Sequence, residues 1–221
     1  MEPTSNCSSA SGGRGCGVAA AVMQAVESQT LILYHTDLRG QWPQAAARAF
    51  TARLPYARRL ALGSGSAAAH ASLAGIALAL HALTRLLGRC VPLSEIRFAR
   101  GAKPRLAPPL ADFSISHAGP WAACAALARG RVGLDLEVGT DERMAEWVLR
   151  EAMLKGSGDG LRALREVQDL TVHEGRARWR GTSWHVQRLA GFDGASACIV
   201  CSREVPAVES NALALTELFV T

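Results

Sequence analysis

The chain has 221 residues, enough for one large domain or two small ones, and 49% of them are hydrophobic, which excludes wholesale disorder. Only 19% are charged and 5% aromatic, so a coiled coil or a collagen-like rod is excluded and the core is expected to consist of small aliphatic side chains. The net charge of +5 suits anionic partners but is too small to indicate a nucleic-acid-binding protein by itself.

The first half of the chain begins with a stretch rich in Ser and Gly at residues 1–17, which predicts a flexible tail. This stretch lacks the basic and apolar regions of a secretion signal, so free cysteines and a cytoplasmic location are expected. Residues 30–35 are typical of a strand, and a polar loop around Trp42 and Pro43 leads into a helix that ends near Gly88.

One segment of this half is apolar enough to resemble a membrane span. Residues 60–84 contain no Asp, Glu, Lys or Arg. The larger aliphatic side chains form a single helical stripe, at Leu73, Ile76, Leu80, Leu83 and Leu87. A single stripe predicts an amphipathic helix that faces the core, and we expect no contact with a membrane.

The remaining elements repeat the same theme of a few strands and a long helix. A strand is expected at 95–99, and the proline-rich link 103–109 marks a boundary between two halves. The second half is expected to contain strands at 112–116, 121–127, 132–138, 178–189 and 195–200, with a helix from about 141 that either ends near 154 or continues to 167. The sequence therefore predicts an α+β fold of two similar subdomains, residues 18–109 and 110–221. Each has a small antiparallel sheet and one long helix, and a ligand site is expected in the groove between them.

Cys198 and Cys201 have the CxxC spacing of a zinc ligand pair. No second pair accompanies them, and the alternation around them is typical of a buried strand. We therefore expect these two cysteines to be part of the core.

Two acidic side chains share one face of the expected strand 132–138. Because side chains alternate along a strand, Asp135 and Glu137 project together, opposite the apolar residues. They are either solvated or directed into a cleft, and in a cleft their repulsion requires a cation. Hard oxygen ligands select Mg²⁺ or a related ion.

The helix that follows supplies a third carboxylate. Trp147, Glu151 and Lys155 are spaced i, i+4 and i+8, so they lie along one stripe. Glu151 and Lys155 alone would form an ordinary surface ion pair. However, the chain has 22 Arg and only two Lys, Lys103 and Lys155, and a compact ammonium suits a phosphate or an attacking hydroxyl. The sequence thus predicts a three-carboxylate metal site beside a lysine.

Polar and basic residues upstream of this site suggest a phosphate-bearing ligand. Ser114 and Ser116 share one face of the expected strand 112–116, and His117 stands at its end. Between residues 96 and 131, six basic residues accompany a single acid, Asp112. His117 is either a structural hydrogen-bonding residue or a phosphate donor, and the basic surroundings favour the second role.

The order of these segments along the chain resembles the order of motifs in the 4′-phosphopantetheinyl transferases, in particular the pseudo-dimeric type that activates surfactin synthetase. The matching segments are Lys103-Pro104, Phe113-Ser-Ile-Ser-His117, Gly133-Leu-Asp-Leu-Glu137 and the helical segment 147–155. Enzymes of this family move the phosphopantetheine arm of coenzyme A onto a serine of an acyl or peptidyl carrier protein. The resemblance covers mainly residues 101–160.

The resemblance implies a role for each matching residue. Mg²⁺ would be held by Asp135, Glu137 and Glu151. Coenzyme A would be bound by Lys103, Ser116, His117 and Arg150. Glu151 and Lys155 would be catalytic, with either Glu151 or a water on the metal as the base. The expected partners are coenzyme A and a carrier protein, with no nucleic acid or membrane, and the chain is expected to be a monomer.

Two departures from the family pattern keep other functions open. Only nine residues separate Glu137 from Trp147, where similar enzymes have a long insert, and the helix at 71–80 lacks the arginines that bind the nucleotide. Residues that could replace those arginines are Arg58, Arg59, His70 and His81. The alternatives are a non-catalytic relative that binds carrier protein or coenzyme A, and a Mg²⁺-dependent phosphohydrolase.

Overall fold

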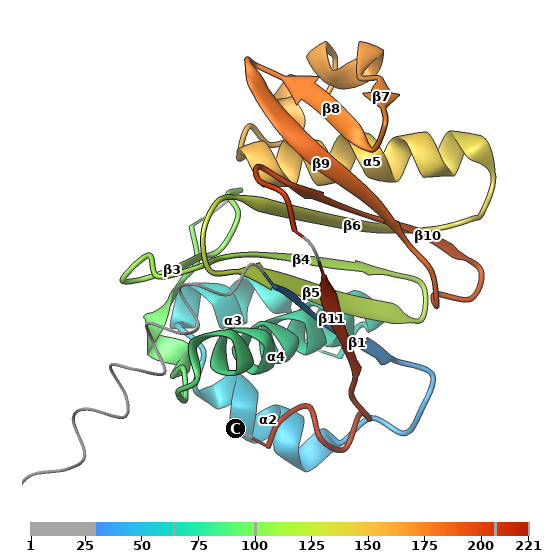
Figure 1. Cartoon of the computed structure of the whole chain (residues 1–221). Helices are drawn as coiled ribbons and strands as arrows, with labels where there is room; N and C mark the ends of the chain where they lie inside the picture. Colours follow the sequence, from blue (N-terminus) through green and yellow to red (C-terminus); the bar gives the residue numbers. More distant parts are fainter. Residues whose placement is uncertain (1–29, 64, 100, 206, 221) are drawn as a thin grey trace, which may run out of the picture.

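A computed structural model of the chain describes residues 30–63, 65–99, 101–205 and 207–220 (Figure 1). The fold is α+β, as expected from the sequence. The predicted tail at 1–17 and the start of the expected first subdomain lie outside the described residues.

The first sheet has the strand order β11-β1-β5-β4. Its strands are β1 (Leu31–Asp37), β4 (Asp112–Ala118), β5 (Trp121–Leu127) and β11 (Val208–Ala212). β5 pairs antiparallel with β1 and with β4, whereas β11 pairs parallel with β1. The sheet is therefore mixed, and the expectation of purely antiparallel strands is wrong for β11.

The second sheet has the order β6-β10-β9-β8-β7 and is antiparallel throughout. Its strands are β6 (Val132–Val138), β7 (Val172–His173), β8 (Arg176–Trp179), β9 (Thr182–Leu189) and β10 (Ala195–Cys201). The expected single strand at 178–189 is a hairpin, because the chain turns at Arg180 and Gly181, which both have positive φ. The expected strand at 95–99 is reduced to β2 (Ile96–Arg97), which pairs with β3 (Arg105–Leu106).

The helices are α2 (Gln44–Ala52), α3 (Tyr56–Leu62), α4 (Ala67–Leu87) and α5 (Glu142–Ser157), with short 3-10 turns at Leu93–Glu95, Leu161–Ala163 and Glu166–Asp169. Ser66 and Asp141 cap the N-termini of α4 and α5, accepting hydrogen bonds from Ala69 and Met144. α4 is long and apolar enough to cross a membrane, but two thirds of its apolar window is buried inside the fold. The aliphatic stripe predicted for it is buried, so the expectation of a core helix is confirmed.

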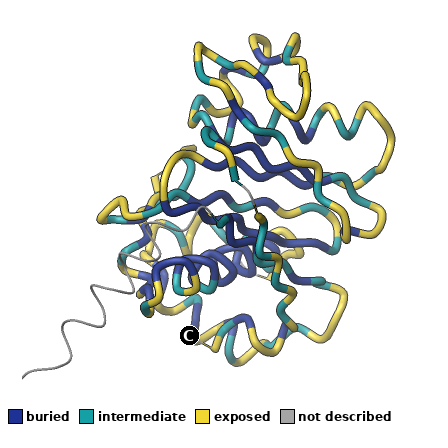
Figure 2. The backbone as a smooth tube through the Cα atoms, in the orientation of Figure 1, coloured by how far each residue is buried: buried dark blue, intermediate teal, exposed yellow. Residues whose placement is uncertain are grey.

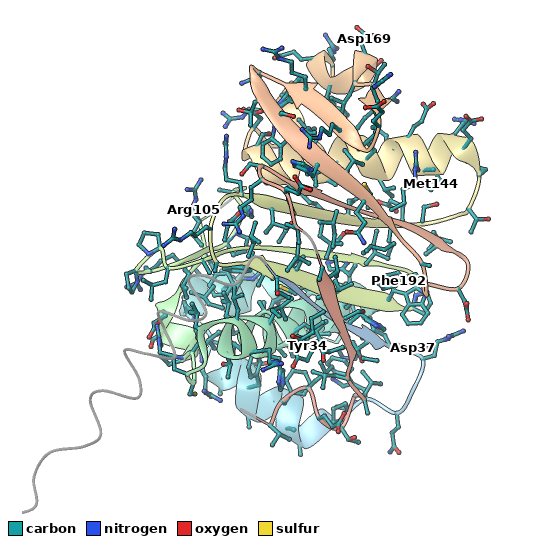
Figure 3. All side chains as sticks on the ribbon, in the orientation of Figure 1. Tyr34, Asp37, Arg105, Met144, Asp169 and Phe192 are labelled. Carbon is teal, nitrogen blue, oxygen red and sulfur yellow. The ribbon has the colours of Figure 1, made fainter. Side chains whose placement is uncertain are left out.

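The elements form four layers, with an apolar cluster between each two neighbouring layers (Figure 1). α4 covers one face of the first sheet, the two sheets face each other, and α5 covers the far face of the second sheet. Figure 2 shows the buried residues along α4 and the strands of both sheets. Phe192 lies at one end of the sheets and Arg105 at the opposite end (Figure 3). Cys198 and Cys201 are buried in β10, and burial raises the pKa of each thiol to about 12.

The sheets divide the chain differently from the boundary expected at residue 110. β4 and β5, which that boundary assigns to the second half, pair into one sheet with β1. The segment 207–220 also returns to this sheet, through β11. The proline-rich link at 103–109 therefore connects two elements of the same layered unit, and the change of sheet occurs between β5 and β6.

β4 and β6 are joined by hydrogen bonds from main chain to side chain. β6 is an edge strand of its sheet. The side chains of Asp112, Ser114 and Ser116 accept hydrogen bonds from the backbone N–H groups of Val132, Leu134 and Leu136, at 2.8, 3.0 and 3.2 Å. Alternate residues of both strands take part, with a constant offset of 20 residues. We call this set of bonds the β4–β6 seam.

Glycine allows α5 to approach β6 closely. A Cβ atom on Gly133 would lie 1.9 Å from the carbonyl oxygen of Ala152 and 2.5 Å from the nitrogen of Gly156. Both neighbours are backbone atoms, which do not move aside as a side chain does. The glycine of the Gly133–Glu137 segment thus sets the distance between the strand with Asp135 and the helix with Glu151.

We predict that Gly133→Ala destabilises the fold by more than about 3 kcal/mol, because overpacking against backbone exceeds the usual core penalty. Gly40→Ala is the matched control, since its Cβ would meet only the end of the Leu215 side chain, at 3.1 Å, which can shift by a few tenths of an ångström. Denaturant unfolding of both variants measures the difference. Equal stability of the two variants would contradict the proposed limit on the helix–strand distance.

Candidate metal and anion site

Three carboxylates from two elements converge beside the β4–β6 seam. Asp135 and Glu137 project from β6 toward α5, where Glu151 lies. One oxygen of each carboxylate lies within 4.8 Å of the others. The sequence prediction that these three residues come together is confirmed.

Asp135 is the buried member of this triad, with 1% of the residue exposed. Its Oδ1 accepts hydrogen bonds from Ser116 Oγ at 2.8 Å and from Lys155 Nζ at 2.5 Å. Its Oδ2 is buried and has no hydrogen-bond partner. An unpaired buried carboxylate oxygen is costly, so this atom indicates a ligand that the protein alone does not provide.

The two glutamates carry uncompensated negative charge. Within the described part of the chain, neither Glu137 nor Glu151 forms an ion pair, and Lys155 is the one cation bonded to the triad. Desolvation raises the pKa of both glutamates, and the charge of Asp135 raises them further, while Lys155 opposes the shift. An ion pair with a purely structural role would match one carboxylate with one cation, whereas here three carboxylates share one lysine.

A cavity of about 370 Å³ opens onto the triad. Its other charged or titratable lining residues are Arg58 from α3, His117 from β4 and Lys155 from α5. Arg58 places its guanidinium 5.5 Å from the centre of the Phe98 ring, and its Nε is buried without a hydrogen-bond partner. Desolvation lowers the pKa of Arg58. A cavity with acids on one side and such a cation on the other suits a metal-bound anion.

His117 stands between α4 and the triad. Its Nε2 lies 3.2 Å from Ser72 Oγ. Although part of the residue is exposed, desolvation of the ring lowers the pKa of His117, and the charge of Lys155 lowers it further. This shift of the pKa below its ordinary value of 6.5 favours the neutral form of His117 when no anion is bound.

Two larger cavities adjoin the first at residues Ala102 and Pro104, which line all three. One of about 640 Å³ is shared with Lys155 and is lined by Lys103, Ile115, Leu154 and the residues 158–162. The other, of about 580 Å³, is shared with Arg58 and is lined by Phe98 and one side of α3. Together they offer room for a ligand much longer than a diphosphate.

Two predicted site residues are engaged elsewhere. Lys103 Nζ donates to Asp112 Oδ2 at 2.5 Å and to the carbonyl oxygen of Val132 at 2.7 Å, at the far end of the seam. Arg150 pairs with Glu146 and lines a separate cavity with Met144, labelled in Figure 3. The roles expected for Lys103 and Arg150 toward coenzyme A stay predictions.

The structure adds residues to the site that the sequence did not single out. Ser72 lines the 370 Å³ cavity, although nothing in the alanine-rich segment around it marks it as functional. Of the residues named as replacements for the missing arginines, Arg58 lines this cavity, whereas His81 contacts Leu218 O and His70 stacks on Trp42.

No family model matches the chain, and no curated protein matches it significantly.

We predict that Glu151→Gln stabilises the metal-free protein near pH 7. The folded state raises the pKa of Glu151 above its ordinary value of 4.5. The free energy of unfolding therefore falls as the pH rises from the ordinary pKa to the raised pKa, and the loss is complete above the raised pKa. Removing the charge should raise the Tm at pH 7 by about 2–4 °C, the effect of about 1 kcal/mol in a domain of this size. At pH 4 the difference should vanish.

The control for this measurement is Glu146→Gln, because Glu146 lies on the same helix, is half exposed and pairs with Arg150. It should leave the Tm nearly unchanged at both pH values. A Glu151→Gln protein that melts at or below the wild-type temperature at pH 7 would show that the triad is not under electrostatic strain.

Proposed function

We propose that this protein transfers the 4′-phosphopantetheine group of coenzyme A to a serine of a carrier protein, with the help of a divalent cation. The observation that supports this function best is the triad itself. An unpartnered buried oxygen of Asp135 stands beside two glutamates and a lysine, in a cavity that the cation of Arg58 also lines. The order of the motifs in the sequence supports the same reaction.

The donor set fits a hard divalent cation such as Mg²⁺. All three candidate ligands are carboxylates, which such ions prefer, and Asp135 Oδ2 needs a partner. When bound, the cation would neutralise the charge of the diphosphate that is broken in the reaction. Asp135, Glu137 and Glu151 would hold it.

The remaining residues of the cavity would bind and orient the substrate. Lys155 and Arg58 present positive charge from opposite helices, and the neutral His117 can donate a hydrogen bond to a phosphate oxygen. Glu151, with its raised pKa, suits the acceptance of the proton of the attacking serine hydroxyl. The serine oxygen would then form a bond to the phosphorus, and adenosine 3′,5′-bisphosphate would leave.

We take the two units, each a sheet with its helix, as two subdomains, with the substrate in the groove between them. The 580 Å³ cavity, with the Phe98 ring and the Arg58 cation, suits a nucleotide. The 640 Å³ cavity, with Ile115, Leu154 and Leu161, suits the less polar pantetheine arm. The carrier protein would approach from the open side of the triad, and the chain would act as a monomer.

Glu151→Gln should lower the rate of transfer by about 100-fold or more, because it removes both a metal ligand and the proposed proton acceptor. The assay is mass spectrometry of an apo carrier protein incubated with coenzyme A and Mg²⁺, in which transfer appears as the added phosphopantetheine mass. Glu146→Gln, on the same helix and outside the triad, should keep the wild-type rate. Coenzyme A binding without transfer to several carriers would favour a non-catalytic role, and release of phosphate from small phosphoesters would favour a hydrolase.

Arg58→Ala should weaken the binding of coenzyme A by about 10- to 100-fold, the usual worth of a hydrogen bond to a charged group. The control is Arg59→Ala, because Arg59 lies next in the chain but bonds to the carbonyl oxygen of Ala52. Isothermal titration of both variants with coenzyme A makes the comparison. Equal affinities would remove Arg58 from the proposed binding site.

A further inference from the structure

Lys155 is the cation that contacts the carboxylate triad in the metal-free protein, so a metal ion would have to bind next to its ammonium. Its ammonium lies 2.5 Å from Asp135 Oδ1 and 3.0 Å from Ser116 Oγ. The partner of this bond, Asp135, is the buried member of the triad, and its other oxygen is the atom without a partner. Lys155 thus neutralises one of three clustered negative charges when nothing else is bound.

We infer that Lys155 is a competing counter-ion of the triad: it holds Asp135 in the metal-free protein and leaves it for an anion when a divalent cation binds. The inference rests on the metal site of the proposed function. It adds to that function a coupling between the two ligands, in which cation and anion bind tightly only together.

Charge repulsion between the ammonium and the metal ion explains why Lys155 would leave Asp135. A divalent cation at the triad would lie a few ångström from the Lys155 ammonium, and like charges at that distance repel strongly even at an intermediate dielectric. Among the described residues Lys155 forms an ion pair only with Asp135, and the two other acids near it, Glu137 and Glu151, would themselves hold the cation. A phosphate oxygen in the cavity would provide the new partner. Cation and anion would therefore strengthen each other's binding, by the same factor in both directions.

The surroundings allow Lys155 to move while Asp135 stays in place. Lys155 is about one third exposed and lines both the 370 Å³ and the 640 Å³ cavity, so its ammonium has open space on two sides. Asp135 keeps the hydrogen bond from Ser116 at 2.8 Å when the lysine leaves. Ser116 is in turn fixed to the N–H of Leu136 in the seam.

The test is the binding of Mn²⁺ alone, followed by electron paramagnetic resonance of the free ion. Lys155→Gln should bind Mn²⁺ about tenfold or more tightly than the wild type, because the neutral amide still donates a hydrogen bond to Asp135 but no longer repels the ion. Lys155→Met, of similar length, tests the same point without the hydrogen bond. Arg143→Met is the matched control: it removes one positive charge from the same helix, about 18 Å away along the axis, and should leave the affinity unchanged.

Adenosine 3′,5′-bisphosphate is the anion probe for the second half of the inference. It should strengthen Mn²⁺ binding by a larger factor in the wild type than in Lys155→Gln, since only the wild type has an ammonium to release. The Mn²⁺-induced rise in Tm, which needs no catalysis, should correspondingly be larger for Lys155→Gln when the anion is absent.

Equal or weaker Mn²⁺ binding by both lysine variants would overturn the inference, even in a wild type that transfers phosphopantetheine. Tighter binding by the variants would support it even if no carrier protein is modified, in which case only the proposed reaction fails. The absence of Mn²⁺ binding in the wild type and both variants would overturn the inference together with the metal site.

Discussion

The β4–β6 seam is the constraint on which the site depends. An edge strand normally needs a partner strand for its N–H groups, but here Asp112, Ser114 and Ser116 supply single side-chain acceptors instead. This fixes the register of β6 against β4. A slip by one residue would turn Asp135 away from α5 into the apolar layer between the sheets. Because Ser116 also donates to Asp135, the bonds that hold the sheets together extend directly into the carboxylate triad.

The clustering of three carboxylates has an energetic cost in a chain whose composition otherwise favours the packing of small apolar side chains. Its core consists mainly of Ala, Leu, Ile and Val, and the Gly133 contact brings α5 as near to β6 as backbone atoms permit. Bringing the helix this close leaves Asp135 buried and raises the pKa of Glu137 and Glu151. A buried charge is tolerated when it is compensated, and Lys155 compensates one of three. A bound cation would supply the positive charge that the other two carboxylates lack.

Local patterns predicted the parts of the site that lie on one element. Alternation along β6 placed Asp135 and Glu137 on one face, and helical spacing placed Glu151 beside Lys155. What the patterns could not predict is the contact between segments far apart in the chain. Arg58 and Ser72 line the cavity of the triad through the packing of α3 and α4, and neither has a periodic signal that points to it. The pairing of β1 with β5 across the expected boundary at 110 could not be predicted for the same reason, since a proline-rich link looks like a domain boundary unless that pairing is known.

The two lysines of the chain make the same kind of contact at opposite ends of the β4–β6 seam, in different surroundings. Each ammonium bridges β4 and β6: Lys103 bonds to Asp112 and the Val132 carbonyl, and Lys155 bonds to Ser116 and Asp135. A compact ammonium with three donors suits such a bridge, because it acts as a point charge and needs no planar, two-pronged acceptor as arginine does. Lys103 is 13% exposed and faces one carboxylate, so its charge is matched and enclosed. Lys155 is 32% exposed and faces three carboxylates across an open cavity. The difference in charge balance and access, rather than in bonding geometry, is what makes the second lysine free to exchange its partner.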